Sequence, residues 1–212
     1  MSELVKGLLS GDRFAIATLI SAIEDGEGVS QAMRALFPHT GHAFTIGITG
    51  SPGAGKSTLT NMLIGKIRKE KKKVAVLAID PSSPFTGGAL LGDRVRMQDH
   101  ATDPDVFIRS MATRGHLGGM TLATPEAIRV LDAAGNDFVI VETVGVGQAE
   151  VSITDAADTT VVVLNPGWGD SIQAGKAGLL EIADIFVINK SDREGTKQTV
   201  REIEQMIHFG PA

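Results

Sequence analysis

The sequence predicts an α/β fold built on an open, mostly parallel β-sheet. From residue 43 onward, strand-like runs alternate with segments of helical periodicity, which is typical of parallel strands joined by helices. Several runs are almost continuously apolar, for example residues 74–79 and 138–141. Such runs indicate strands buried on both faces. In a sheet of this kind, ligands are expected at the carboxyl ends of the strands.

Residues 1–42 predict a helical extension that precedes the main domain, placed at residues 43–212. Apolar residues recur at helical spacing on both sides of Gly11, and Asp12 is expected to cap the second helix. A third helix is expected over about 29–37. Nothing in the extension suggests catalysis, so packing on the main domain is favoured over a partner-binding role.

Strands and helices alternate through the main domain. Strands are expected near residues 44–49, 74–79, 105–109, 138–142, 160–164 and 184–188, and helices over 56–70, about 125–134, about 171–181 and 196–207. The buried face of the first helix is expected to contain Leu59, Met62, Leu63 and Ile67. Thr124 is expected to cap the helix over about 125–134, with Pro125 in its first turn. Six basic residues lie between residues 66 and 73, at the end of the helix over 56–70. This basic run is interpreted as a solvated helix end that complements the helix dipole.

Composition limits the class of protein. The 212 residues carry a net charge of −5, which argues against a general nucleic-acid binder. They contain no cysteine, which excludes disulfides and thiolate metal sites. No apolar run approaches the roughly 20 residues that span a bilayer, so no membrane association is expected. The first residues lack a signal-peptide pattern, and a cytoplasmic enzyme is the default expectation.

The strongest motif lies between the first strand and the next helix. A glycine, four residues and Gly-Lys-Ser match a phosphate-binding loop in a strand–loop–helix context. Glycines let the backbone aim its N–H groups at phosphate oxygens, and the helix N-terminus adds positive field. Lys56 is expected to reach the β- and γ-phosphates, and the Ser57 hydroxyl to bind Mg²⁺. The predicted nucleotide-binding residues here are Gly50, Ser51, Pro52, Gly53, Ala54, Gly55, Lys56, Ser57 and Thr58.

Two carboxylates are predicted near the phosphates on the next part of the chain. The second strand ends at Asp80, which places a carboxylate at the rim of the sheet. A glycine-containing stretch then leads to Asp93, Arg94 and Arg96. We expect a mobile segment that brings Asp93 and the arginines over the nucleotide; an ordinary surface loop is the alternative.

The end of the fourth strand carries a pattern typical of nucleotide switches. Glu142 is followed three residues later by Gly145; in such switches the acid holds Mg²⁺, usually through water, and the glycine N–H contacts the γ-phosphate. Here the acid is glutamate rather than the commoner aspartate. Val146 stands where small switch GTPases have a water-orienting glutamine. Slow hydrolysis by the isolated chain is therefore predicted.

The end of the sixth strand predicts which base is bound. Asn189, Lys190 and Asp192 match the guanine-recognition pattern Asn-Lys-x-Asp. The Asp192 carboxylate can accept hydrogen bonds from the guanine N1–H and 2-amino groups, which adenine cannot donate. Because a carboxylate left unpaired by adenine is costly, a large preference for guanine is expected.

Other distinctive residues are not assigned to a site. Trp168, the only tryptophan, lies among glycines after the fifth strand and is either an exposed partner anchor or a packing residue. The five histidines show no ligand spacing and are expected on the surface or in packing. Met97, Met111 and Met120 are expected in the core.

Taken together, these segments resemble the MeaB/ArgK branch of the G3E P-loop GTPases, which have a SIMIBI-type P-loop NTPase fold. The resemblance covers nearly the whole chain, including the helical extension. The matching strings are residues 38–41, 47–58, 80–84, 87–97, 108–115, 142–148 and 182–190. Phosphate loops are widespread, but this combination of strings is specific.

The resemblance implies a function beyond nucleotide binding. Proteins of this branch hydrolyse GTP to GDP and phosphate, with Mg²⁺. They act as chaperones of adenosylcobalamin-dependent mutases, chiefly methylmalonyl-CoA mutase. They gate cofactor loading and protect or reactivate the mutase. The implied cofactors are therefore GTP/GDP and Mg²⁺, and the implied partner is a mutase of this type.

The resemblance also implies roles for individual segments. Residues 80–97 would form switch I and residues 142–148 switch II. Asp170 and Lys176 resemble part of a third switch that contacts the mutase. The implied metal ligands are Ser57, Asp80, Asp93 and Glu142, and the implied catalytic residues are Lys56, Asp93 and Glu142.

The family pattern and two other classes give contrasting expectations. Family members continue with a further base-contacting loop and a C-terminal dimerisation arm; this chain ends at Ala212 with neither, so the family's homodimer is not carried over to this shortened chain.

An ATP-dependent kinase or an arginine/ornithine transport ATPase would favour ATP and need a small-molecule acceptor pocket. A nickel-insertion GTPase would normally carry a His-rich or Cys-containing metal site, and the lack of cysteine weighs against it.

Overall fold

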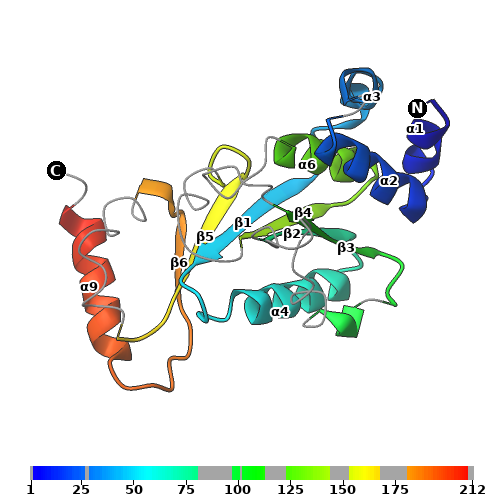
Figure 1. Cartoon of the computed structure of the whole chain (residues 1–212). Coiled ribbons are helices and arrows are strands. Elements are labelled where there is room, and N and C mark those ends of the chain that lie inside the picture. The colour runs from blue at the N-terminus through cyan, green and yellow to red at the C-terminus, as the bar shows by residue number, and fades with distance from the viewer. Residues whose placement is uncertain are drawn as a thin grey trace, which may run out of the picture.

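The computed structural model describes residues 2–26, 29–80, 97–100, 102–112, 123–143, 153–167 and 181–209. These residues form a six-stranded parallel sheet with helices on both faces (Figure 1). The predicted α/β class with an open parallel sheet is therefore confirmed. The helix predicted over about 171–181 falls almost wholly outside the described residues.

All six predicted strands are present, with ends that differ from the predicted ones by three residues or fewer. They are β1 Phe44–Gly50, β2 Val74–Asp80, β3 Val106–Ala112, β4 Phe138–Thr143, β5 Thr159–Leu164 and β6 Ile185–Ile188. Their order across the sheet is β3-β2-β4-β1-β5-β6, and every neighbouring pair is parallel. All carboxyl ends therefore meet at one edge, where β1 lies between β4 and β5.

The first three helices lie where the sequence predicts them. They are α1 Ser2–Leu9, α2 Arg13–Glu24 and α3 Val29–Leu36, followed by the short 3-10 helix η1 Phe37–His39. Asp12 caps α2 as predicted, because its carboxylate accepts a hydrogen bond of 2.9 Å from the backbone N–H of Phe14.

The other described helices are α4 Lys56–Lys69, the 3-10 helix η2 Gln98–His100, α6 Thr124–Ala133 and α9 Thr196–Phe209. The predicted cap of α6 is wrong. Ala123, the residue before the helix, already has helical backbone angles, φ −80° and ψ −13°. The turn is therefore wound before Thr124, which is the first helical residue and is fully buried.

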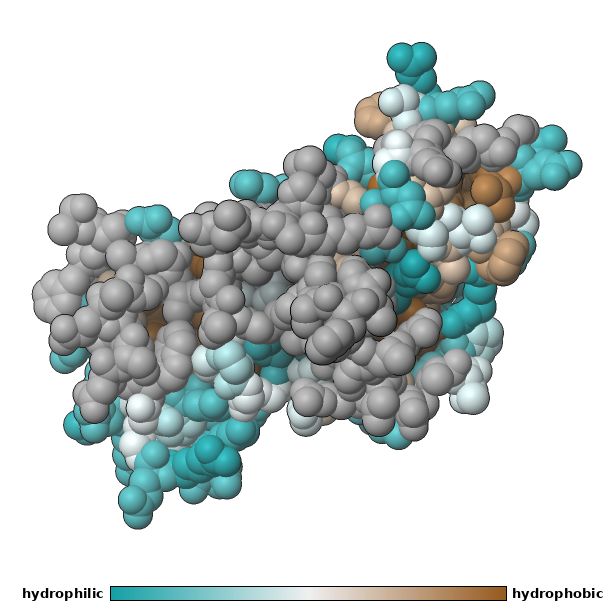
Figure 2. All heavy atoms as spheres, in the orientation of Figure 1, coloured by the Kyte–Doolittle hydropathy of each residue, from teal (hydrophilic) through white to brown (hydrophobic). Residues whose placement is uncertain are grey.

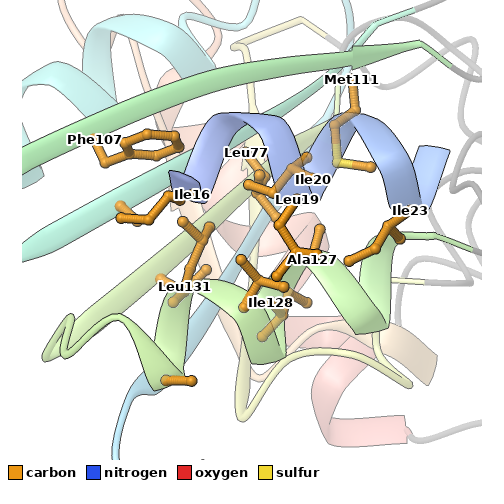
Figure 3. Close-up of a cluster of buried hydrophobic side chains, with 14 of the residues drawn as sticks. Ile16, Leu19, Ile20, Ile23, Leu77, Phe107, Met111, Ala127, Ile128 and Leu131 are labelled. Atoms are coloured by element: carbon orange, nitrogen blue, oxygen red, sulfur yellow. The ribbon is translucent and has the colours of Figure 1, made fainter. Parts of the chain in front are cut away.

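Two apolar clusters sandwich the sheet. On one face, α1, α2, α3 and α6 pack against alternate residues of β2, β3 and β4. Figure 3 shows the part of this cluster in which α2 and α6 meet β2 and β3, among them Leu19, Leu131 and Leu77. On the other face, α4 packs against the intervening residues, among them Ile140. This division follows from the strand period, which points successive side chains to opposite faces. Met97 and Met111 are fully buried, as predicted; Met120 lies outside the described residues.

The buried face of α4 differs from the predicted one at two positions. Met62 is 63% exposed, whereas Ile64, absent from the predicted face, is fully buried. Leu59, Leu63 and Ile67 are partly buried against the same cluster. The most buried positions of α4 are Lys56, Ser57, Thr60 and Ile64. Three of these four are polar, which is why apolar spacing alone misplaced the face.

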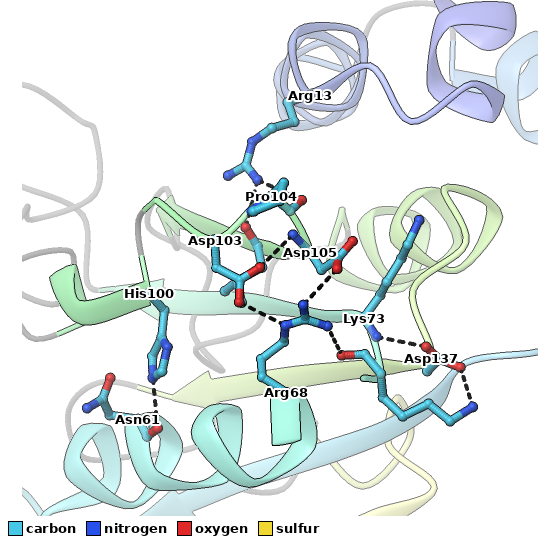
Figure 4. A network of polar contacts seen from close by, with 11 residues as sticks. Arg13, Asn61, Arg68, Lys73, His100, Asp103, Pro104, Asp105 and Asp137 are labelled. Carbon is cyan, nitrogen blue, oxygen red and sulfur yellow. Dashed lines mark hydrogen bonds and ion pairs between the residues drawn. The ribbon is translucent and has the colours of Figure 1, made fainter. Parts of the chain in front are cut away.

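The edge of the sheet at the amino ends of the strands is held by ion pairs (Figure 4). Arg68 bonds Asp103 at 2.9 Å and Asp105 at 2.7 Å, and Lys72 bonds Asp137 at 2.8 Å. The hydrogen bond from Arg68 lowers the pKa of Asp103, and the hydrogen bond from Lys72 lowers the pKa of Asp137. Part of the basic run after α4 is therefore paired, and the interpretation as a solvated end was incomplete.

The surface around the first helices is partly apolar. In Figure 2, tan and brown residues gather there among hydrophilic ones, and hydrophilic residues lie along the lower part of the end that carries α9. The exposed apolar side chains of the extension include Leu9, Phe14 and Phe37. Within the described ranges, no helix has both the length and the apolar character needed to cross a membrane.

Candidate functional site

Two glycines shape the loop between β1 and α4. Gly50, the last residue of β1, has a φ of +130°, and a Cβ there would lie 2.0 Å from the Val163 carbonyl oxygen on β5. Gly55 caps α4 with a φ of +94°, and a Cβ there would lie 2.3 Å from Asn189 Nδ2. Gly50 is therefore required both for its close approach to the β5 backbone and for its backbone conformation. Gly55 is required for its left-handed conformation, and a Cβ there would also displace the Asn189 side chain.

Lys56, the first residue of α4, folds back over this loop. Its buried side chain donates hydrogen bonds to the Gly50 carbonyl oxygen at 2.8 Å and to the Ser51 carbonyl oxygen at 3.2 Å. The ammonium group therefore lies at the start of the loop, beside the positive end of the α4 dipole. This combination favours an anion at the loop.

Glu142 meets α4 from the neighbouring strand. Val141 packs in the cluster on the opposite face and Ile140 in the cluster on the α4 side, so strand alternation directs Glu142 toward α4. Glu142 is 1% exposed. Its carboxylate accepts hydrogen bonds from Ser57 Oγ at 2.6 Å and from Thr60 Oγ1 at 2.7 Å. These bonds offset the cost of burying a carboxylate.

The segment after β6 is fastened to the same loop. Asn189 Nδ2 donates to the Ala54 carbonyl oxygen at 2.8 Å, and Lys190 Nζ donates to the Gly53 carbonyl oxygen at 2.6 Å. Lys190 has a φ of +54°, a left-handed conformation that is uncommon for lysine. The predicted base-recognition and phosphate-binding segments are thus in direct contact, although Asn189 lies 135 residues after Ala54.

The remaining predicted site residues are less fully described. Asp192 is exposed, two residues beyond Lys190. Asp80 ends β2 at the carboxyl edge, and only its backbone is described. The predicted site residues outside the described ranges are Asp93, Gly145, Asp170 and Lys176, and the unassigned Trp168 lies outside them too. The structure therefore brings together the loop, Glu142 and the Asn189 segment.

The family model described as methylmalonyl Co-A mutase-associated GTPase MeaB matches residues 16–211. The chain belongs to the MeaB family. The resemblance inferred from the motifs is thereby confirmed.

Curated relatives of this MeaB-family chain are longer than it is. A Pyrococcus abyssi protein with a provisional GTPase name is 60% identical over 204 residues, which cover 96% of this chain and 63% of the relative. GTPase ArgK of Escherichia coli is 42% identical over 197 residues, covering 91% and 60%. A Caenorhabditis elegans protein, methylmalonic aciduria type A homolog, mitochondrial, is 39% identical over 208 residues, covering 91% and 52%. The chain thus spans less than two thirds of each of these relatives.

Solved structures agree with the fold of the MeaB-family chain. The crystal structure of an LAO/AO transport system kinase matches with a TM-score of 0.76 and 31% identity, over 100% of this chain and 64% of that one. The hydrogenase maturation factor HypB from Archaeoglobus fulgidus matches with a TM-score of 0.56 and 18% identity, over 90% of this chain and 82% of that one. The second match supports a shared fold alone.

The donor set of this MeaB-family site fits a magnesium nucleotide. Ser51 Oγ is buried, and within the described residues it has no hydrogen-bond partner, as expected for a hydroxyl that faces a ligand oxygen. Ser57 and Glu142 supply the oxygen donors that Mg²⁺ prefers. A hydroxyl that donates its proton can still coordinate through its lone pairs. In the described part of the chain there is no group of three or more metal-binding His, Asp or Glu residues; Mg²⁺ commonly needs only one or two protein ligands beside phosphate and water.

Two buried contacts of the site are not predicted by the sequence patterns. Thr60 binds Glu142, and Thr143 Oγ1 donates to Thr49 Oγ1 at 2.9 Å beside the loop. The signal for Thr60 was its place four residues after Lys56, on the same side of the helix. The contact between Thr49 and Thr143 depends on the pairing of β1 with β4, which no local pattern specifies.

Proposed function

We propose that this chain binds GTP with Mg²⁺ and hydrolyses it slowly to GDP and phosphate. The observation that carries the proposal is the direct contact of the Asn189 segment with the loop that leads into Ser57, whose hydroxyl bonds Glu142. The segments proposed to recognise the base, the phosphates and the metal would then contact the same bound nucleotide. Membership of a family described as mutase-associated GTPases supports the same conclusion.

In this proposal, the loop holds the triphosphate. Its N–H groups and the Lys56 ammonium donate to phosphate oxygens, and Gly145 N–H contacts the γ-phosphate. Asn189 and Lys190 fix the base-recognition segment, and Asp192 accepts hydrogen bonds from guanine. Thr58 and Pro52 complete the loop at its exposed side.

The metal function rests on oxygen ligands. Ser57 and Glu142 would hold Mg²⁺, with Asp80 nearby and Asp93 supplied by the segment after β2. The ion, when bound, neutralises charge that develops on the transferred phosphoryl group. Glu142 keeps its carboxylate in place through two hydroxyl donors, so little reorganisation is required when the ion arrives.

Slow turnover follows from what the chain offers to the attacking water. Val146 cannot orient a water molecule by hydrogen bonding, unlike the glutamine of small switch GTPases. We expect phosphate release by the chain alone to be far below about 10 s⁻¹, the typical enzyme value. A rate near that value in a phosphate-release assay would contradict a switch-like role.

The partner is proposed to be an adenosylcobalamin-dependent mutase of the methylmalonyl-CoA mutase type. The family description and the name of the Caenorhabditis elegans relative support this choice. Asp170 and Lys176 are proposed to contact the mutase when the nucleotide changes. The chain would then gate cofactor loading or protect the mutase.

Calorimetric titration of GTP into the chain, with and without such a mutase, tests the proposal. We expect GTP binding in both cases and a change of at least threefold in affinity when the mutase is present, because coupling of the two sites must be reciprocal. A mutase that neither binds the chain nor changes its GTP affinity would contradict the chaperone role. Absence of GTP binding would contradict the nucleotide role as well.

A further inference from the structure

Thr60 is a polar residue at the centre of the buried face of α4. It is 0% exposed and lies between Lys56 and Ile64, each four residues away along the same side of the helix. Ile64 packs in the apolar cluster between α4 and the sheet. A hydroxyl at such a position costs free energy unless it is hydrogen-bonded, so its partner is informative.

The partner of the Thr60 hydroxyl is the carboxylate of Glu142. Thr60 Oγ1 lies 2.7 Å from Glu142 Oε2 and 3.0 Å from the Lys56 carbonyl oxygen. A hydroxyl has one proton to donate. The shorter contact and the charge of the acceptor favour donation to Glu142, because hydrogen bonds to ionised groups are shorter and stronger.

Thr60 and Ser57 together fix both oxygens of this carboxylate. Ser57 donates to Oε1 and Thr60 to Oε2 from positions three residues apart on one face of α4. Glutamate has one more rotatable bond than the aspartate common at this position, so it needs more restraint to present one geometry. Two donors on opposite oxygens fix the rotation of the carboxylate plane.

The two hydroxyl donors differ in whether they are also proposed to bind the metal. Ser57 is itself a proposed Mg²⁺ ligand, so its hydroxyl must serve both the metal and Glu142. Thr60 lies deeper along α4 and has no proposed contact with nucleotide or metal. It can therefore hold Glu142 in the same position whether or not the ion is bound.

We propose that Thr60 is a positioning residue that sets the Mg²⁺ affinity of the nucleotide site through Glu142. This inference rests on the proposed function, since it concerns the metal of that same site. The general precedent is that partners behind a metal ligand change metal affinity by about 10- to 100-fold when removed.

The test is the Mg²⁺ dependence of GDP release, measured with a fluorescent GDP analogue. Thr60→Val keeps the shape and removes the hydroxyl, Thr60→Ser keeps the hydroxyl, and Thr160→Val is a matched loss of a buried hydroxyl on β5. We expect Thr60→Val to need about 10-fold more Mg²⁺ to slow release. Thr60→Ser and Thr160→Val should stay within about threefold of the wild type. GDP affinity in excess chelator should be the same in all four proteins.

The outcomes separate this inference from the function on which it rests. Equal Mg²⁺ dependence of the wild type and Thr60→Val, or equal weakening by Thr60→Val and Thr60→Ser, would overturn the positioning role and leave the proposed function intact. If GDP release from the wild type did not depend on Mg²⁺, both the positioning role and the proposed magnesium site would be overturned. A double-mutant cycle of Thr60→Val with Glu142→Gln, read from denaturant unfolding without nucleotide, should show coupling; additive effects would overturn the inference independently of any ligand.

Discussion

The two edges of the sheet are both polar, but their polar groups have different partners. At the amino edge, Arg68 and Lys72 bind carboxylates that precede β3 and β4. At the carboxyl edge, Lys56 and Lys190 bind carbonyl oxygens of the loop between β1 and α4. The basic side chains of the amino edge thus bind carboxylates, whereas those of the carboxyl edge bind the backbone of one loop.

This difference separates structural from functional polarity. Ion pairs at the amino edge join the turns that enter β2, β3 and β4, and such a network serves the fold. The carboxyl edge places ammonium groups, a helix N-terminus and the buried Glu142 beside one loop. A ligand with negative charge and a metal can use that arrangement, whereas the amino edge offers no comparable loop within the described residues.

The largest expected difference between the edges concerns glycine. Gly50→Ala at the carboxyl edge would drive a Cβ to 2.0 Å from the Val163 carbonyl oxygen, whereas Gly135→Ala, in the turn before β4, would meet nothing within 4 Å. Both glycines have positive φ. We expect a loss of at least about 4 kcal/mol for the first and about 1–2 kcal/mol for the second. Urea unfolding checks both, and equal losses would show that the close approach is relieved by backbone movement.

A second pair of variants should separate binding from stability. Lys56→Ala is expected to weaken GTP binding by about 100-fold, since the phosphate loses a charged donor worth about 3 kcal/mol, and to cost about 1–2 kcal/mol of unfolding free energy, because the Gly50 and Ser51 carbonyl oxygens lose their buried donor. Arg68→Ala is expected to cost about 1–2 kcal/mol of unfolding free energy and to leave GTP affinity within about twofold. Calorimetry and urea unfolding of both proteins provide the comparison. If Arg68→Ala weakened GTP binding as strongly as Lys56→Ala, the division between the edges would fail.

Asp132, also at the amino edge, binds uncharged backbone N–H groups instead of a basic side chain. Its carboxylate, near the end of α6, accepts hydrogen bonds from the backbone N–H groups of Gly41, His42 and Ala43, just before β1. Asp132→Ala should cost about 2 kcal/mol, because three backbone N–H groups lose a buried, charged acceptor. Asp155→Ala, an exposed aspartate, is the control in thermal unfolding. A loss no greater than the control's would show that these N–H groups find other partners.

The smallest expected effect is the acid sensitivity of the amino edge. The folded pKa of Asp103 lies below its ordinary value because of the Arg68 hydrogen bond, and the pKa of Asp137 is lowered by Lys72. The stabilisation is present above the unfolded pKa and is lost as pH falls through the lowered folded pKa. The stability gap between wild type and Arg68→Ala should therefore be constant from about pH 5 to 7 and shrink below about pH 4. A gap that persists undiminished to about pH 2 would contradict this assignment.

Local sequence patterns were sufficient for the positions of the strands and for the glycine loop between β1 and α4. Near-continuous apolar runs have few alternatives to buried parallel strands, and a glycine loop between strand and helix is hard to mistake. The contacts between distant segments were not predictable in detail. Thr60 on Glu142 and Asp132 on the turn before β1 join residues about 80–90 positions apart, and no periodicity encodes such pairs.

Two predictions are wrong because residue type alone does not determine the surroundings of a side chain. Apolar character predicts Met62 inside, but α4 turns polar residues inward at the site and leaves Met62 in solvent. Residue type predicts a cap at Thr124, but Ala123 already has helical backbone angles. The assigned roles of Asp93, Gly145, Asp170 and Lys176 stay predictions, since these residues lie outside the described ranges.

The central claim is that the carboxyl edge binds a guanine nucleotide. It is tested most directly by calorimetric titration of GTP and ATP, with Mg²⁺, into the wild type and into Asp192→Asn, with Glu194→Ala as a control for a nearby exposed carboxylate. We predict at least about 100-fold tighter binding of GTP than of ATP by the wild type and the control, because adenine cannot pair with the Asp192 carboxylate. That preference should be largely lost in Asp192→Asn. Equal affinity of the wild type for GTP and ATP would contradict the account.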